Sequence, residues 1–124
     1  MKTSLAEIVD RYRSLLEKGD NLAVIDLFYG DAIEHIENNE LPIVGRTALR
    51  AREEKIVNSV HDFSQTITSI VIDEEKEIVM GEMDISFNSK KHGPQKLVEA
   101  FVQHWKNGKI VYQKFYYNTR PNDK

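Results

Sequence analysis

The chain has 124 residues, a formal net charge of −3 and no cysteine. This length is typical of one domain with a single core, and the interspersed charges exclude the basic stripe by which proteins bind nucleic acid. Without cysteine there is no disulfide, thiolate nucleophile or thiolate metal site, and no stretch is apolar over membrane length. We therefore expect a cytoplasmic protein with neither a nucleic-acid nor a membrane partner.

The first predicted element is a helix over residues 5–16 that ends in the sequence RYRSLLEKGD. Tyr12 lies at the centre of its apolar stripe, so its hydroxyl group needs a hydrogen-bond partner in the interior. Gly19 and Asp20 predict a helix end and a new N-cap, followed by a short second helix over residues 21–30 that ends at Gly30. The other members of the first stripe are Leu5, Ile8, Val9, Leu15 and Leu16.

A short strand, AIEHIEN, follows at residues 32–38, and two registers are possible for it. One register faces Glu34 and Ile36 inward, and the other faces His35 and Glu37 inward. An imidazole beside a carboxylate can exchange protons near neutral pH, so the second register supplies an acid–base pair. Periodicity does not decide between the two.

The loop ELPIVG leads to a third predicted helix over residues 46–60, whose apolar stripe contains a carboxylate. Glu53 lies four residues after Leu49 and three before Ile56. Such a group should be protonated, hydrogen-bonded or next to a wet cavity. Two interpretations remain: a glutamate that leans out of the core, or a contact between Tyr12 and Glu53 inside a pocket.

The second half of the chain predicts a four-strand antiparallel meander over residues 64–73, 77–88, 96–105 and 109–118, because Ile, Val, Thr, Phe and Tyr alternate there with polar residues. Helices followed by a meander imply an α+β domain in which three helices cover one face of a bent sheet. We expect a single domain over residues 1–118 and a flexible tail at 119–124.

In each of the last two predicted strands, one side carries polar residues together with large aromatic residues. One side of the third strand of the meander carries Glu99, Phe101, Gln103 and Trp105, and one side of the fourth carries Gln113, Phe115 and Tyr117. Aromatic and polar groups together are typical of a cavity wall, although ordinary core packing is the alternative. The four histidines lack the spacing that would bring several to one metal ion, so we expect no metal and no cofactor.

Four segments in this order resemble the nuclear transport factor two superfamily, and within it the branch of steroid delta-isomerases and SnoaL-like polyketide cyclases. The segments are RYRSLLEKGD, LFYGDA, VGRTALR and HWKNGKIV. The resemblance implies a cystatin-like, cone-shaped α+β barrel with an internal pocket, commonly a homodimer through the convex sheet face. It also implies that Phe101, Gln103, Trp105, Gln113, Phe115 and Tyr117 face the cavity.

The resemblance retains only part of the steroid isomerase machinery. Tyr12 matches the tyrosine that donates to the substrate oxyanion in those enzymes. An ungapped match, however, places Ile36 at their general-base aspartate and Phe101 at their second oxyanion donor. Neither side chain can transfer a proton, so we do not expect steroid isomerisation by that machinery.

Two hypotheses follow for function. In the first, the protein is a small isomerase, cyclase or dehydratase that acts on an apolar carbonyl compound through the candidate catalytic residues Tyr12, Glu53, Glu99 and His35. In the second, it is a non-catalytic dimer whose pocket holds a ligand or is a packed core. The expected ligand-binding residues are Glu34, Ile36, Met83, Phe87, Phe101, Gln103, Trp105, Gln113, Phe115 and Tyr117.

Overall fold

The protein folds into three helices packed on one six-stranded sheet, as described for residues 3–118 in a computed structural model. The predicted tail at 119–124 lies outside the described residues. The helices are α1 (Leu5–Glu17), α2 (Asn21–Phe28) and α3 (Arg46–Ser59). The strands are β1 (Tyr29–Glu37), β2 (Ile43–Val44), β3 (Val60–Asp73), β4 (Ile78–Ser89), β5 (Gly93–Lys106) and β6 (Lys109–Tyr116).

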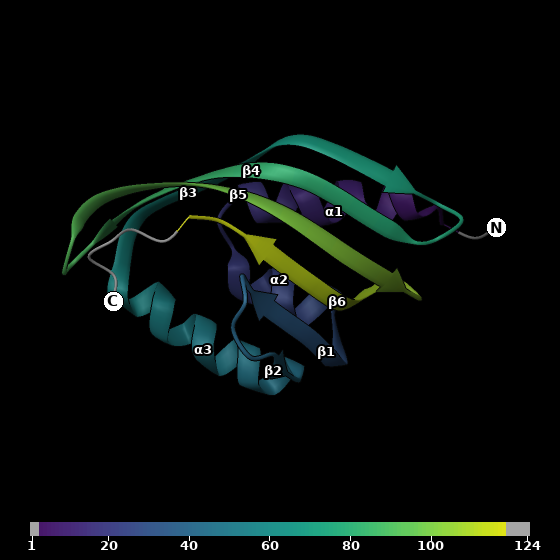
Figure 1. The fold of residues 1–124 in the computed structure, drawn as a ribbon, viewed down its shortest axis with the longest axis horizontal. Helices are drawn as coiled ribbons and strands as arrows, with labels where there is room; N and C mark the ends of the chain where they lie inside the picture. Colours follow the sequence, from purple (N-terminus) through teal and green to yellow (C-terminus); the bar gives the residue numbers. More distant parts are fainter. Residues whose placement is uncertain (1–2, 119–124) are drawn as a thin grey trace.

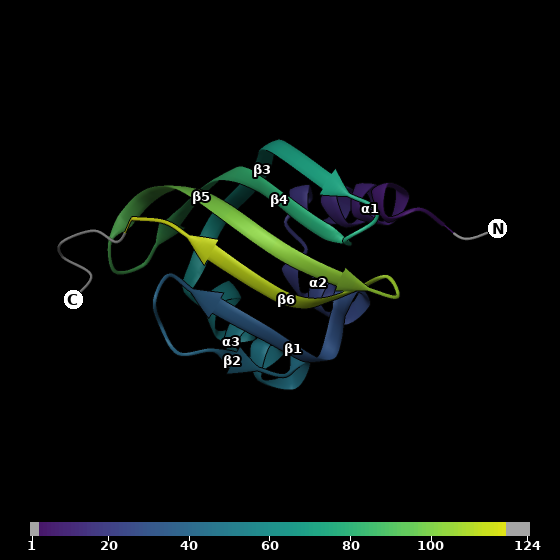
Figure 2. The ribbon, with the colours of Figure 1, turned by 45° about the vertical axis from the view of Figure 1, so that its right-hand side comes forward.

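The sheet has the order β2-β1-β6-β5-β4-β3 and bends strongly, with the helices on its concave side (Figure 1). Strands β3 to β6 form the predicted antiparallel meander, and β1 joins it in parallel beside β6. The α+β fold with a strongly curved, mainly antiparallel sheet is therefore confirmed. Figure 2 shows β1 and β6 side by side, with α3 behind β1.

Local sequence accounts for the helix boundaries near the N-terminus. The Ser4 hydroxyl accepts a hydrogen bond from the backbone N–H of Glu7, and the Asp20 carboxylate accepts one from that of Ala23. These contacts satisfy N–H groups that have no partner within a helix. Gly19, at a φ of 84°, reverses the chain between α1 and α2, as predicted.

Several boundaries differ from those expected, including the start of β3 at Val60 rather than at residue 64. The second helix ends at Phe28 rather than at Gly30, because Tyr29 takes an extended conformation and pairs with Ile110. At Gly30 a Cβ atom would lie 3.2 Å from the carbonyl oxygen of Ile110, so this glycine permits a close approach of strands and does not end the helix. The predicted loop ELPIVG contains the short strand β2, which pairs with β1.

The core lies between the helices and the concave side of the sheet. The sequence places large apolar side chains there at helical and strand periods, and burial of each contributes about 1.5–3 kcal/mol. Its most buried members are Val9, Tyr12, Val24, Ile25, Ile33, Leu49, Ile67, Val79, Phe101, Trp105 and Ile110. Towards the end of the sheet where β5 begins, this packing gives way to a cavity.

Candidate functional site

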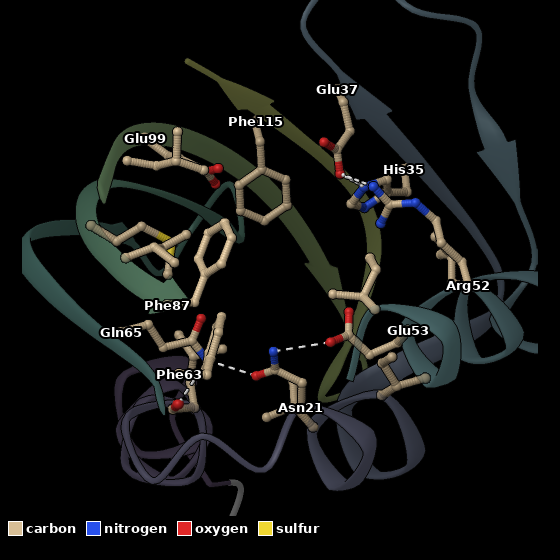
Figure 3. Close-up of a pocket in the computed structure, with 18 of the residues that line it drawn as sticks. Asn21, His35, Glu37, Arg52, Glu53, Phe63, Gln65, Phe87, Glu99 and Phe115 are labelled. Carbon is tan, nitrogen blue, oxygen red and sulfur yellow. Dashed lines mark hydrogen bonds and ion pairs between the residues drawn. The ribbon is translucent and has the colours of Figure 1, made fainter. Parts of the chain in front are cut away.

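A cavity of about 240 Å³ lies between α3 and the curved sheet (Figure 3). Its wall is mainly apolar, with side chains from all three helices and from strands β1 and β3 to β6. Figure 3 shows Phe63, Phe87 and Phe115 projecting towards its centre, with the charged side chains of Glu99, Glu37, Arg52 and Glu53 above and to the right of them. An apolar space with a few converging polar groups is the usual form of a small-molecule site.

Glu37 is the centre of an ion cluster at one side of this cavity. Its Oε2 atom accepts hydrogen bonds from His35 Nε2 and Arg52 Nη2, each at 2.8 Å, and the Tyr117 hydroxyl donates to Oε1. Burial alone would raise the pKa of Glu37, but the hydrogen bonds from His35 and Tyr117 and the charge of Arg52 lower it to about 2. Glu37 is therefore ionised at neutral pH.

A chain of hydrogen bonds under the cavity fixes the tautomer of His35. The Trp105 indole can only donate, so its bond to Gln103 Oε1, at 3.2 Å, turns Gln103 Nε2 towards Gln113 Oε1. Gln113 Nε2 then faces His35 Nδ1 at 2.9 Å, so Nδ1 accepts and the neutral imidazole carries its hydrogen on Nε2. This hydrogen is the one donated to Glu37.

The two tyrosines at the inner end of the cavity accept hydrogen bonds from the side-chain amides of Gln103 and Gln113. Gln103 Nε2 donates to the Tyr12 hydroxyl at 3.0 Å, and Gln113 Nε2 donates to the Tyr29 hydroxyl at 2.8 Å. Burial, opposed only in part by Gln103, raises the pKa of Tyr12 to about 12, and burial raises that of Tyr29 as well. Both hydroxyl groups are therefore neutral near pH 7.

Glu53 is held as a hydrogen-bond acceptor, but not by Tyr12. The carbonyl oxygen of Leu16 can only accept, so it orients the Gln65 amide, whose Nε2 donates to Leu16 O at 2.8 Å and to Asn21 Oδ1 at 2.6 Å. Asn21 Nδ2 in turn donates to Glu53 Oε2 at 3.2 Å. Of the two interpretations of Glu53, the contact with Tyr12 is therefore wrong, because each residue has an amide partner of its own.

The Glu99 carboxyl group faces the cavity without a donor among the described residues (Figure 3). The residue is only 9% exposed. Burial and the negative charge of Glu37 raise its pKa to about 7, although the charge of Arg52 acts in the opposite direction. Glu99 can therefore bind or release a proton near neutral pH.

The structure brings eight of the predicted site residues to the cavity wall, including all four candidate catalytic residues. They are Tyr12, His35, Glu53, Met83, Phe87, Glu99, Phe115 and Tyr117. The first strand takes the register with His35 inward, so Glu34 and Ile36 do not line the cavity. Phe101, Gln103, Trp105 and Gln113 point to the same concave side but are packed in the interior beneath the cavity.

Four polar residues of the site were not singled out from the sequence: Asn21, Tyr29, Arg52 and Gln65. Arg52 stands next to Glu53 on a helix rich in charges, where one more arginine suggests a solvated face. Asn21 and Gln65 follow ordinary patterns for a helix start and a strand. That Arg52 faces the interior could have been predicted from its position three residues after Leu49, since residues three apart share a helix face.

Among residues 3–118, no group of three or more His, Asp or Glu side chains is placed to hold a metal ion. None of the helices in this part of the chain has both the length and the apolar character required to cross a membrane.

Comparison with known proteins identifies a domain family and solved structures that are similar to this chain. The family model of the SnoaL-like domain matches residues 3–117, whereas no curated protein sequence matches the chain. A Mesorhizobium loti protein named as a SnoaL-like polyketide cyclase superimposes with a TM-score of 0.78 at 25% identity, over 93% of this chain and 100% of its own.

Two further solved structures have a similar fold but are named for other activities or folds. An epoxide hydrolase from M. tuberculosis gives a TM-score of 0.74 at 17% identity, over 92% of this chain and 82% of its own. A Catenulispora acidiphila protein with a ketosteroid isomerase-like fold, in complex with trimethylamine, gives 0.73 at 17% identity, over 90% and 85%. At these identities the likeness shows the fold alone.

Proposed function

The chain belongs to the SnoaL-like domain family, whose model spans residues 3–117, and we propose that it is an acid–base enzyme acting on a small carbonyl compound. The observation that carries this proposal is Glu99. It is a cavity-facing carboxyl group without a hydrogen-bond donor among the described residues, and its pKa is about 7. A proton carrier is most effective when its pKa lies near the working pH.

The proposed step is removal of a proton from a carbon next to a carbonyl group. Glu99 takes the proton as a carboxylate, the electron pair of the C–H bond forms the new C=C bond, and the π pair of the C=O bond moves onto the carbonyl oxygen. If a C=C bond lies next to the deprotonated carbon, the dienolate recovers the proton from Glu99 at the far carbon, which is an isomerisation. If a second carbonyl group is within reach, the enolate carbon attacks it and the alkoxide formed takes the proton from Glu99, which is a cyclisation.

Arg52 is the group best placed to stabilise the enolate oxygen. Its charge acts on Glu99, and only one of its five N–H groups is engaged with Glu37. The base that takes the proton and the group that donates a hydrogen bond to the oxygen of the same carbonyl group can lie about 8 Å apart at most. Tyr12 is bound to Gln103, four strand residues or about 13 Å along β5 from Glu99, so it belongs to the other end of the cavity.

Glu37 acts as a positioning residue for Arg52. Its carboxylate is ionised over the neutral range and holds the guanidinium at 2.8 Å. Arg52 is thereby kept from a direct ion pair with Glu99, which leaves Glu99 able to take a proton.

Deuterium exchange tests the proposal without a known substrate. We would follow incorporation of deuterium next to the carbonyl group of 2-tetralone in D₂O by NMR. The protein should accelerate exchange, and Glu99→Gln should lower the acceleration by about a hundredfold or more. Glu82→Gln, at an exposed site on the neighbouring strand β4, is the matched control and should leave it unchanged. Equal exchange by the Glu99→Gln and unaltered proteins would refute the role of Glu99.

We also propose that the convex face of the sheet binds a second copy of the chain. Val71, Met80 and Val102 form one row across β3, β4 and β5, and Val71 and Met80 are 71% and 50% exposed. Exposed apolar patches of this kind mark interaction surfaces. Sedimentation equilibrium should give a dimer that Met80→Lys dissociates, and a monomeric unaltered protein would contradict the proposal.

A further inference from the structure

The inner end of the cavity presents a carboxylate without a cationic partner. Glu37, Glu53 and Glu99 line the cavity, whereas Arg52 is the one arginine or lysine in its described wall. Arg52 is paired with Glu37 at 2.8 Å. Among the described residues, Glu53 therefore has only the uncharged Asn21 amide as a hydrogen-bond partner, and the charge of Arg52 acts on it without a direct ion pair.

The hydrogen-bond chain behind Glu53 favours its ionised form. The orientation of Asn21 is set by Gln65 and the Leu16 carbonyl, so its Nδ2 group can only donate towards Glu53. A donor bound to a carboxyl oxygen stabilises the carboxylate relative to the acid. Burial outweighs the Asn21 hydrogen bond and the charge of Arg52, so the pKa of Glu53 is raised above its ordinary value, and a positive charge beside Glu53 would offset this effect.

The surrounding side chains suit a positive charge on an organic molecule. Tyr12 and Tyr29 line the cavity with Glu53, and the negative charge of Glu53 acts on Tyr29. Aromatic faces carry negative electrostatic potential and attract ammonium groups, including fully alkylated ones. A metal ion would need more oxygen or nitrogen ligands than this end of the cavity offers.

We propose that the ligand of this cavity is an organic cation, an amine whose charged nitrogen lies between Glu53 and the aromatic side chains at the inner end. This inference rests on the proposed function, because it takes the cavity as the substrate site. It narrows the substrate class to carbonyl compounds that carry an amine, with the carbonyl group towards Arg52 and Glu99.

The test compares two probes of the same shape that differ in charge, phenyltrimethylammonium and tert-butylbenzene. Binding is measured by ¹H–¹⁵N NMR titration of the Asn21 side-chain amide at physiological ionic strength, which screens exposed charges. The cation should bind about tenfold more tightly than the neutral probe. In Glu53→Gln the preference for the cation should fall severalfold, since a glutamine can still accept the Asn21 hydrogen bond but has no charge, and only the aromatic side chains then favour the cation.

Glu54→Gln is the matched control. Glu54 is the next residue of α3, its side chain is 52% exposed, and its partner is Arg50 outside the cavity. This variant should keep the tenfold preference for the cation.

The outcomes separate this inference from the proposed function. Equal or tighter binding of tert-butylbenzene by the unaltered protein, or an unchanged preference in Glu53→Gln, would overturn the cationic ligand and leave the role of Glu99 standing. If the protein still prefers the cation but does not accelerate deuterium exchange, only the acid–base reaction would be overturned. Failure of both probes to bind would overturn the cavity as a ligand site and both proposals with it.

Discussion

Replacement of Glu37 by glutamine removes the charge around which the ion cluster is built, and its effect on stability should depend on pH. The pKa of Glu37 is about 2 in the folded protein against an ordinary value of 4.5. A difference of about 2.5 in pKa, at about 1.4 kcal/mol for each unit, corresponds to about 3 kcal/mol of folding stability. Because the pKa is lowered on folding, this contribution is complete above pH 4.5 and is lost as the pH falls towards 2.

Urea unfolding followed by circular dichroism measures this effect directly. Between pH 5 and 7, Glu37→Gln should lower the free energy of unfolding by about 3 kcal/mol, which moves the urea midpoint by about 1–2 M. The two proteins should converge near pH 2, where Glu37 itself is protonated. Glu34→Gln is the control, since Glu34 lies on the opposite side of β1 and forms no ion pair with a described residue.

A difference between Glu37→Gln and the unaltered protein that stays constant from pH 7 to pH 3 would refute this reasoning. It would mean that the loss comes from packing and not from the charge. An increase of the difference at low pH would refute it equally.

Three further predictions concern the site and the sheet beneath it. Deuterium exchange should rise with pH and level off above about pH 7, because Glu99 must be ionised to act. In Glu37→Gln the inflection should move to lower pH, because the charge of Glu37 raises the pKa of Glu99. Trp105→Phe removes the donor that orients Gln103, so ¹⁵N NMR of His35 should change from one tautomer to a mixture; a single unchanged tautomer would show that Gln103 is oriented by another contact. Gly81→Ala would place a Cβ atom 2.4 Å from the Ser69 carbonyl oxygen and 2.9 Å from the Phe101 ring. Thermal unfolding should therefore show a loss of about 2 kcal/mol in the free energy of unfolding, and an unchanged Tm would mean that β3 shifts freely.

Part of the site could be predicted from the sequence because it depends on local periodicity. Alternation along β5 separates Glu99 and Gln103 from Val98 and Val102 without knowledge of any other strand. The resemblance then indicated the inward side, and the structure places Glu99 and Gln103 on the concave face. Helix periodicity likewise placed Tyr12 and Glu53 among apolar residues that face the interior.

The hydrogen-bond partners of these residues could not be predicted in the same manner. Gln103 lies 91 residues after Tyr12 in the chain, and Asn21 lies 32 residues before Glu53. Such pairs depend on how helices and strands cross, and on residue type alone a bond between Tyr12 and Glu53 had equally good chemical reasons. Only the packed fold shows that amide groups are closer to both.

The register of β1 separates most clearly what the sequence alone determined from what only the tertiary structure decided. Alternation established that Glu34 and Ile36 share one side of the strand and that His35 and Glu37 share the other. It could not say which side is inside, because both sides combine polar and apolar residues. The parallel pairing of β1 with β6, His35 opposite Gln113, decides this, because the buried Gln113 amide and the Arg52 guanidinium supply partners for His35 and Glu37 that solvent would otherwise have to provide.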